Sequence, residues 1–145
     1  MLNIVMILLT ISFLLRCDCM YYRRDEAFRF IFGQPIKATF KIVKVDGRDG
    51  SANEASALIL DLSPNGIKFS SELDLPIYEK QLILEIYFSL NEKMISMLAE
   101  PKWKKRMSPS SFTYGLVGLD NEETKKEVIE ELKEYVRKNK TSNNN

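Results

Sequence analysis

The sequence contains no histidine. This absence removes the side chain that most often serves as an acid–base group near neutral pH, and with it the Ser–His and Cys–His pairs of nucleophilic catalysis. Mixed Cys/His zinc sites are also excluded, because the two cysteines cannot supply the four ligands of a tetrahedral zinc ion. We therefore expect a binding protein without a metal or cofactor, and not an enzyme.

Cysteine is absent from most of the chain, since Cys17 and Cys19 both lie near the N-terminus. A disulfide framework is therefore excluded for the rest of the protein. This composition fits the reducing cytoplasm, although a domain without cysteine would be stable in either redox compartment. We expect a cytoplasmic protein, with anchoring to a membrane by residues 2–15 as the alternative.

The chain also lacks an excess of charge of either sign, with 21 basic and 20 acidic side chains and a net charge of +1. Domains that bind nucleic acid through bulk electrostatics are usually strongly basic. We therefore expect no DNA or RNA partner. The length of 145 residues allows one domain, with room for an appendage.

The one long hydrophobic run, residues 2–15, is shorter than the about 20 residues that a membrane-spanning helix needs. It also lacks the positive start and the small-residue cleavage site of a secretory signal. Three interpretations remain: a short anchor, a poor signal peptide, or upstream sequence before a true start at Met20. The third is favoured because the composition changes at Met20. We divide the chain into a hydrophobic segment (1–19), a domain (20–139) and a disordered tail (140–145), and expect a membrane partner only if the first segment is real and inserted.

Alternation of apolar and polar residues predicts six short strands. In the second of them Leu58, Leu60 and Leu62 are expected on one face, so that Asp61 and Ser63 share the opposite face. Short strands joined by tight connections indicate a closed or nearly closed antiparallel barrel. The strands are expected over residues 36–42, 55–62, 66–70, 81–90, 94–107 and 112–119, with a turn-rich loop over 46–53.

The period of the pattern then changes to that of a helix over residues 121–138. Asp120 is expected to cap this helix, with Glu123 completing a capping box. Its apolar face is formed by Val128, Ile129, Leu132, Tyr135 and Val136. The predicted fold class is therefore mainly β, with a six-stranded barrel followed by a C-terminal α-helix.

Two polar clusters stand out against this pattern. The segment Asp61-Leu62-Ser63-Pro64-Asn65-Gly66 follows the second strand, and taken alone it is a common strand-ending turn. Arg23, Arg24 and Arg29 precede the first strand, and beside acidic neighbours they could form a solvated charge run. Found together in one small β-rich domain, an arginine cluster and such a turn can hold an anionic purine ligand.

The chain at this point resembles the PilZ domain, a family of bacterial receptor modules for cyclic di-GMP. Its members have a six-stranded barrel, an R-x-x-x-R motif on an N-terminal arm and a [D/N]-x-S-x-x-G motif after the second strand. Asp61, Ser63 and Gly66 match the second motif at every specified position. The resemblance extends over residues 21–138, including the order of the strands and the terminal helix.

The arginine motif departs from the family pattern. Four residues separate Arg24 from Arg29, where the family usually has three. Counted back from Arg29, the first arginine position is occupied by Asp25, whose charge would repel a phosphate. Either the arm bulges to bring Arg24 into place, or the chain binds the ligand weakly or not at all.

The resemblance implies a role for each matching residue toward cyclic di-GMP, which is a ligand and not a cofactor. Arg23 or Arg24, together with Arg29, would contact the phosphates or the guanine edges. Asp61 would accept hydrogen bonds from guanine N–H groups, and Ser63 would bond to the base or to the backbone. Bound ligand would change the conformation of the arm and signal to an unidentified protein effector, as in bacterial regulation of motility and biofilm formation.

Other residues receive structural interpretations. Gly66 is expected to supply a turn with positive φ and a close approach, without direct contact to the ligand. Trp103 is expected to be a plug or a rim aromatic, with stacking on a base as the alternative. Phe28 and Phe30 are interpreted as anchors of the arm. The chief rival for the function is a ligand-independent PilZ-like adaptor that acts through protein contacts.

Overall fold

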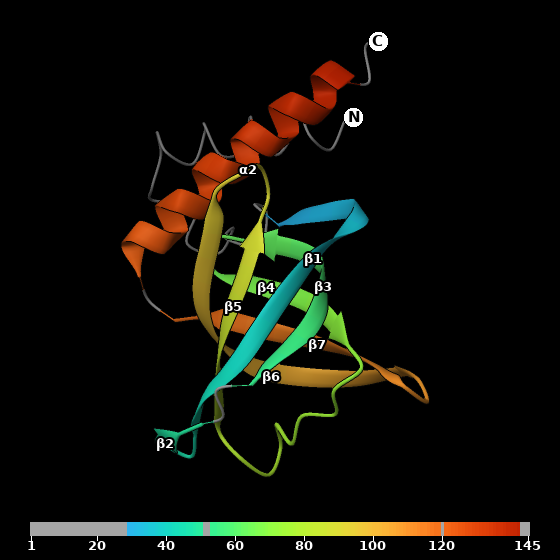
Figure 1. The fold of residues 1–145 in the computed structure, drawn as a ribbon, viewed down its shortest axis with the longest axis vertical. Helices are drawn as coiled ribbons and strands as arrows, with labels where there is room; N and C mark the ends of the chain where they lie inside the picture. Colours follow the sequence, from blue (N-terminus) through green and yellow to red (C-terminus); the bar gives the residue numbers. More distant parts are fainter. Residues whose placement is uncertain (1–28, 51–52, 120, 143–145) are drawn as a thin grey trace, which may run out of the picture.

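The computed structural model describes residues 29–50, 53–119 and 121–142 (Figure 1). The described residues form seven strands and one helix. These are β1 (Phe30–Val45), β2 (Arg48–Asp49), β3 (Glu54–Ser63), β4 (Gly66–Ser71), β5 (Leu82–Ser89), β6 (Met94–Ser108), β7 (Ser111–Gly118) and α2 (Glu122–Ser142).

All strand pairs are antiparallel, and they form one sheet in the order β2-β1-β3-β4-β7-β6-β5. Strand β5, at one end of this order, also pairs with β1, where it is hydrogen-bonded along the β1 residues from Ala38 to Val45. The six longer strands are therefore connected in a closed ring. The predicted fold class, mainly β with antiparallel strands and a C-terminal helix, is confirmed.

The core lies inside this ring, where one face of every long strand is apolar. Strand β5 shows the alternation most clearly, because every second side chain from Leu82 to Phe88 is at most 3% exposed. Phe40 of β1 stacks on Phe69 of β4, with ring centroids 5.1 Å apart, and Tyr114 of β7 contacts the same ring edge-on. The predicted strand 81–90 and its inward face are therefore confirmed.

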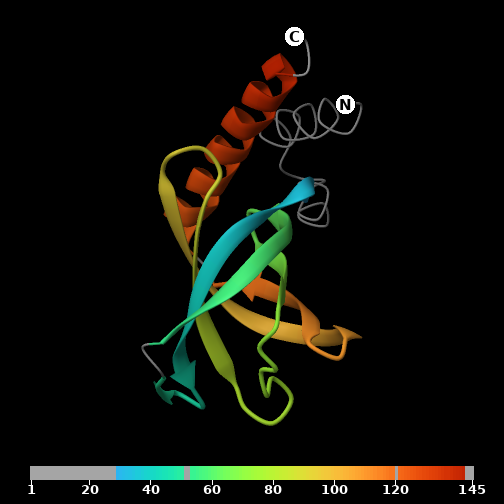
Figure 2. The same ribbon diagram turned by 45° about the vertical axis from the view of Figure 1, so that its right-hand side comes forward.

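Helix α2 lies across one end of the ring, while β2 and the β4–β5 connection lie at the other end (Figures 1 and 2). It buries one face at a spacing of four residues, formed by Val128, Leu132 and Val136. Tyr135 packs edge-to-face against Phe30 and Phe32 of β1, with centroid distances of 5.8 and 5.5 Å. The helix thereby holds the start of β1 through Phe30, whereas the other predicted anchor of the arm, Phe28, lies outside the described residues.

The two ends of α2 differ from the prediction in detail. Asn121 Oδ1 accepts a hydrogen bond from the Thr124 N–H at 3.2 Å, which is the geometry of a helix N-cap. The predicted cap, Asp120, lies outside the described residues. The helix continues to Ser142, so its backbone reaches into the segment 140–145 predicted as a disordered tail. No helix in the described part of the chain is long and apolar enough to cross a membrane.

The segment 46–53, predicted as a loop, contains the short strand β2. Asp46 and Gly47 have φ angles of 51° and 82°, and two successive positive φ angles give a tight hairpin turn that matches the twist of the strands. Beyond this turn, Val45 pairs with Arg48 and Lys44 with Asp49. The prediction of six strands therefore missed one short hairpin.

Strand β1 begins at Phe30, six residues before the start predicted from alternation. Its pairing with β3 is interrupted between Ile31 and Ile36, where the register shifts. Gly33 and Pro35 lie in this interruption, and they break the alternation from which the strand was predicted. The extra length matters for the site, because it pairs the start of β1 with the end of β3.

The leucine face predicted for the second strand is wrong. Ile59 points into the core at 0% exposure, whereas Leu58 is 42% exposed on the outside of the ring. The register of β3 with β4 shifts between Ile59 and Asp61, so Leu60 is an additional residue at a β-bulge. The bulge reverses which residues of the alternating pattern point inward. Of the three leucines predicted on the inner face, only Leu62 therefore points into the core.

Candidate ligand-binding site

Asp61 lies on the outer face of the ring, immediately after the bulge in β3. It pairs directly with Ile31 of β1 on one side and with Lys68 of β4 on the other. Directly paired residues project from the same face of a sheet. Ile31 is 74% exposed, so this face is the outside, yet Asp61 itself is only 6% exposed. The motif carboxylate is therefore a shielded group on an outer surface.

The structure brings Arg29 to this carboxylate. Arg29 precedes β1 by one residue and lies two residues before Ile31, on the same side of the chain. Its Nε atom is 3.7 Å from Asp61 Oδ1, and its side chain is 44% exposed. One predicted arginine and the predicted acid thus form an ion pair. The other two predicted arginines, Arg23 and Arg24, lie outside the described residues.

The environment of Asp61 acts on its pKa in two opposing ways. Burial raises the pKa of the carboxyl above its ordinary value of 3.8, while Arg29 and then Lys68 lower the pKa part of the way back. A shielded carboxylate between two cations can accept hydrogen bonds from a ligand in surroundings of low dielectric, where such bonds are stronger than in water. No group of His, Cys, Asp or Glu in the described residues could hold a metal ion.

Ser63 and Gly66 face each other across the two-residue turn between β3 and β4. Ser63 is 4% exposed, and its hydroxyl donates a hydrogen bond to the Gly66 carbonyl at 3.4 Å. In this conformation the serine side chain stabilises the turn. A ligand acceptor would have to compete with the Gly66 carbonyl for the hydroxyl proton, whereas a ligand N–H group could still donate to the hydroxyl oxygen.

The predicted positive φ at Gly66 is wrong, because among the described glycines only Gly47 has a positive φ. The predicted close approach is confirmed: a Cβ atom at Gly66 would lie 2.6 Å from the Leu116 carbonyl oxygen of β7. Glycine is therefore required here for the space between two strands and not for an unusual backbone conformation.

Lys68 is a residue of this cluster that the sequence reasoning missed. It lies directly opposite Asp61, and its charge lowers the pKa of that carboxyl. A signal for it exists in the sequence. If Ser63 and Gly66 close a two-residue hairpin, counting outward from the turn pairs residue 62 with 67 and residue 61 with 68.

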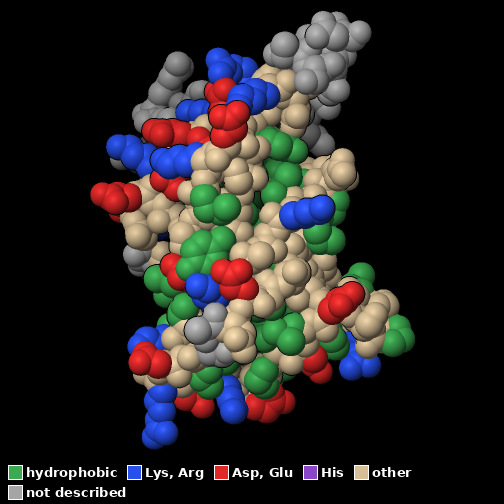
Figure 3. Space-filling model, viewed as in Figure 1, with side chains coloured by type: hydrophobic (Ala, Val, Ile, Leu, Met, Phe, Trp, Pro, Cys, Tyr) green, Lys and Arg blue, Asp and Glu red, His purple; other side chains and the backbone are tan. Residues whose placement is uncertain are grey.

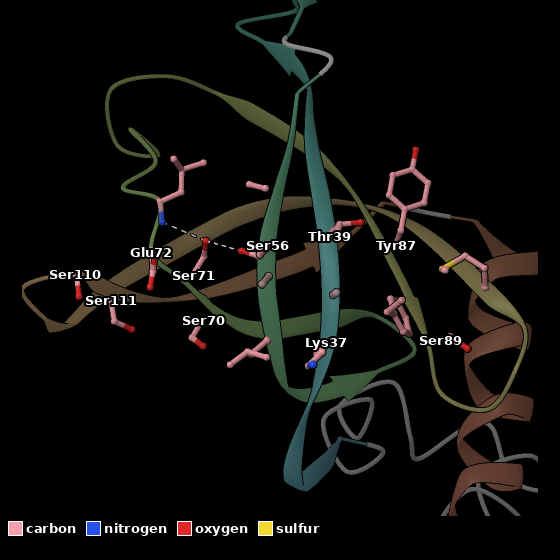
Figure 4. A pocket seen from close by; sticks show the side chains of 17 residues that line it. Lys37, Thr39, Ser56, Ser70, Ser71, Glu72, Tyr87, Ser89, Ser110 and Ser111 are labelled. Atoms are coloured by element: carbon pink, nitrogen blue, oxygen red, sulfur yellow. Dashed lines mark hydrogen bonds between the residues drawn. The ribbon is translucent and has the colours of Figure 1, made fainter.

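A separate hollow of about 1010 Å³ lies elsewhere on the outer surface. It crosses β1 and β3 from β5 to the β6–β7 turn, and none of the predicted site residues lines it (Figure 4). We call it the outer groove. Its lining is rich in hydroxyl groups, including those of Thr39, Ser56, Ser70, Tyr87, Ser89 and Ser111.

Charge is distributed unevenly over the surface. On the face shown in Figure 3, charged side chains of both signs gather over α2 and around the opposite end of the molecule. The surface between these ends is mainly apolar or uncharged.

Comparison with known proteins gives a similarity of fold to solved structures. No family model and no curated protein matches the chain. Among solved structures, the chain is similar to the PilZ domain of CeSA from a cellulose-synthesizing bacterium, with a TM-score of 0.46 and 17% sequence identity. The match covers 70% of this chain and 90% of that chain. The roles of the site residues therefore rest on this chain's own geometry.

Proposed function

We propose that this protein is a receptor domain that binds cyclic di-GMP on the outer face of the ring, at Asp61 and Arg29. The observation that carries the proposal is the shielded carboxylate of the D-x-S-x-x-G motif, 3.7 Å from an arginine that is still 44% exposed. The acid is shielded enough to make strong hydrogen bonds, and the cation is open enough to reach a phosphate.

The chemistry of the ligand fits these two groups. The Watson–Crick edge of guanine offers N–H donors, and a carboxylate accepts two such bonds through its two oxygens. A guanidinium group can pair with phosphate oxygens through parallel hydrogen bonds. Lys68, on the other side of Asp61, would add a second positive charge near the phosphates.

The irregular arginine motif affects only part of this arrangement. Phe30 pairs with Leu62 and Ile31 with Asp61, so the start of β1 is hydrogen-bonded along the end of β3. This pairing holds Arg29 beside Asp61 whatever the spacing to Arg24. The extra residue upstream therefore changes the second arginine and leaves the Arg29–Asp61 half of the site intact.

The proposed activity is that of a switch in bacterial second-messenger signalling in the cytoplasm. Ligand binding would close the segment before Arg29 over the outer face and create a new surface for an effector protein. Because the same ligand groups contact both the segment and β3, the closed state would be favoured only when the ligand is present.

Isothermal titration calorimetry of the full chain with cyclic di-GMP tests the proposal. We expect saturable binding that is lost or strongly weakened in Arg29→Gln and Asp61→Asn. Arg48→Gln and Asp49→Asn are matched controls, because these exposed residues of β2 carry the same charges and lie away from the site. Absence of heat with the wild-type protein at high concentration would refute the receptor function.

The outer groove favours a second candidate, an adaptor that binds a partner protein without a nucleotide. Its volume of about 1010 Å³ and its hydroxyl-rich lining offer a recess separate from Asp61. An adaptor would give no heat with cyclic di-GMP. In a genetic complementation assay it would tolerate Asp61→Asn and fail when Ser56→Trp fills the groove.

A further inference from the structure

The β6–β7 hairpin projects from the side of the ring (Figures 1 and 2). It ends in a two-residue turn between Ser108 and Ser111, which pair with each other. The register shifts between Arg106 and Ser108, so Met107 is an additional residue at a bulge beside this turn. Met107 is 59% exposed. We call residues 105–111 the hairpin tip, and its projecting end therefore carries an exposed apolar side chain.

The same hairpin concentrates positive charge. Between Glu100 and Asp120 the sequence contains four basic residues and no acidic one, although the net charge of the whole chain is only +1. The four basic residues are Lys102, Lys104, Lys105 and Arg106. A local excess of this kind attracts an anionic partner.

Acidic residues neutralise the two cations nearest the ring. Lys102 pairs with Glu100 at 2.8 Å, and Lys104 pairs with Asp74 of the β4–β5 connection at 2.7 Å. Among the described residues, the other two cations of the hairpin have no acidic partner within ion-pair distance. The charge that remains available to a partner is therefore that of the hairpin tip.

Lys105 and Arg106 project from opposite faces of the hairpin, because neighbouring residues of a strand point to opposite sides. Lys105 pairs with Thr113, and Arg106 pairs with Phe112 and lies over its ring at 5.1 Å. The side of a nucleic acid or of an acidic helix would contact only one of these faces. A layer of lipid headgroups entered by the tip surrounds both faces at the same depth.

We propose that the hairpin tip docks on an anionic lipid surface, with Met107 at the boundary of the acyl chains and Lys105 and Arg106 among the headgroups. Anionic headgroups attract basic side chains that lie within a Debye length of the surface. Burial of an apolar side chain at this depth adds to the binding. The contact is peripheral, and it requires neither residues 2–15 nor cyclic di-GMP.

An acidic residue of another element allows a test of sign. Glu72 is exposed at the end of β4, and it lines the outer groove together with Ser110 and Ser111 of the hairpin tip. Its negative charge repels an anionic surface. Removal of this acid should strengthen docking, whereas removal of a cation from the tip should weaken it. A general loss of structure would not change the binding in both directions.

The experiment measures the partition of the full chain onto vesicles of phosphatidylcholine alone and of equal parts phosphatidylcholine and phosphatidylglycerol. We expect stronger binding to the anionic vesicles, and this binding should fall with added salt. Lys105→Gln and Arg106→Gln should each lower the partition coefficient about 5-fold, the contribution of one basic residue near such a surface. Glu72→Gln should raise it. Lys126→Gln, which removes an exposed cation of α2, is the matched control and should leave it unchanged.

A local measurement separates the hairpin tip from the hydrophobic residues 2–15, which could bind a bilayer themselves. In a chain with Cys17→Ser and Cys19→Ser, a polarity-sensitive fluorophore is attached to Met107→Cys at the tip. The same fluorophore on Glu130→Cys, an exposed position of α2, is the control. With anionic vesicles we expect the fluorophore to leave water at position 107 and to stay in water at position 130.

Three results would overturn the proposal: equal partition onto neutral and anionic vesicles, a fluorophore at position 107 that stays in water, or unchanged partition in both Lys105→Gln and Arg106→Gln. Tighter binding to duplex DNA or to polyglutamate than to the anionic vesicles would overturn it in favour of a polyanion that contacts one face. None of these results bears on the receptor function, which is measured with the nucleotide.

Discussion

Replacing Arg29 by glutamine separates the contribution of the Arg29–Asp61 pair to stability from its contribution to binding. The distance of 3.7 Å between Arg29 Nε and Asp61 Oδ1 indicates an ion pair without a short hydrogen bond, and the arginine side chain is 44% exposed. Pairs of this kind contribute at most about 1 kcal/mol to the free energy of unfolding. Arg29→Gln should therefore leave the fold intact.

The effect on ligand binding should be larger. A hydrogen bond to a charged group contributes about 1.5 to 3 kcal/mol. Loss of one such contact to a phosphate or a guanine would raise the Kd for cyclic di-GMP about 10- to 150-fold. A large loss of affinity together with a small loss of stability would identify Arg29 as a residue that binds the ligand.

Urea denaturation and calorimetry on the same preparation measure both quantities. Arg48→Gln, in the exposed strand β2, controls for the loss of one positive charge. A loss of more than about 2 kcal/mol in the free energy of unfolding would show that the ion pair holds the structure together, contrary to the estimate for an exposed pair. A Kd within threefold of wild type would show that Arg29 does not contact the ligand.

Two further predictions concern Asp61 and Tyr114. Burial raises the pKa of Asp61, so the affinity for cyclic di-GMP should be constant near neutral pH and fall as the pH approaches a value above 3.8, and calorimetry of the wild-type protein over a pH series measures this fall. The Tyr114 hydroxyl accepts a bond from the Leu75 N–H at 2.8 Å and donates one to the Leu73 carbonyl at 2.5 Å. Tyr114→Phe should therefore lower the free energy of unfolding in urea by about 1 to 3 kcal/mol.

The sign of the Asp61 effect on stability follows from the same shift. A carboxyl whose pKa is higher in the folded state than in the unfolded state binds protons more tightly when folded, so its contribution to stability is lost as the pH rises through the folded pKa. Asp61→Asn should thus not destabilise the protein at neutral pH. A destabilised Asp61→Asn, or a Tyr114→Phe variant as stable as wild type, would contradict these predictions.

The strands were predictable where alternation is uninterrupted and mispredicted where the backbone departs from a regular ladder. In β5 the alternating pattern gives the inward face without error, because its pairing with β6 contains no register shift. In β3 the bulge at Leu60 reverses the phase. An uncharged leucine at a bulge resembles the leucines before and after it, so nothing in the local composition marks the reversal.

The site was predictable as two motifs but not as a surface. The acid, the serine and the glycine were found because they are close in sequence and match a known pattern. Lys68 joins them only through pairing across strands, which depends on the register of β4 with β3. The first two arginines stay a prediction, because Arg23 and Arg24 lie outside the described residues.

The three aromatic rings that join β1 to α2 connect the proposed binding site to the C-terminal helix. Phe30 is the next residue after Arg29, and it packs edge-on against Phe32 and Tyr135 at 5.0 and 5.8 Å. If a ligand moved the backbone at Arg29, the displacement would reach the C-terminal helix through the contact of Phe30 with Tyr135. In this arrangement the helix would change its position relative to the ring, and Phe30 would be the residue that transmits the change.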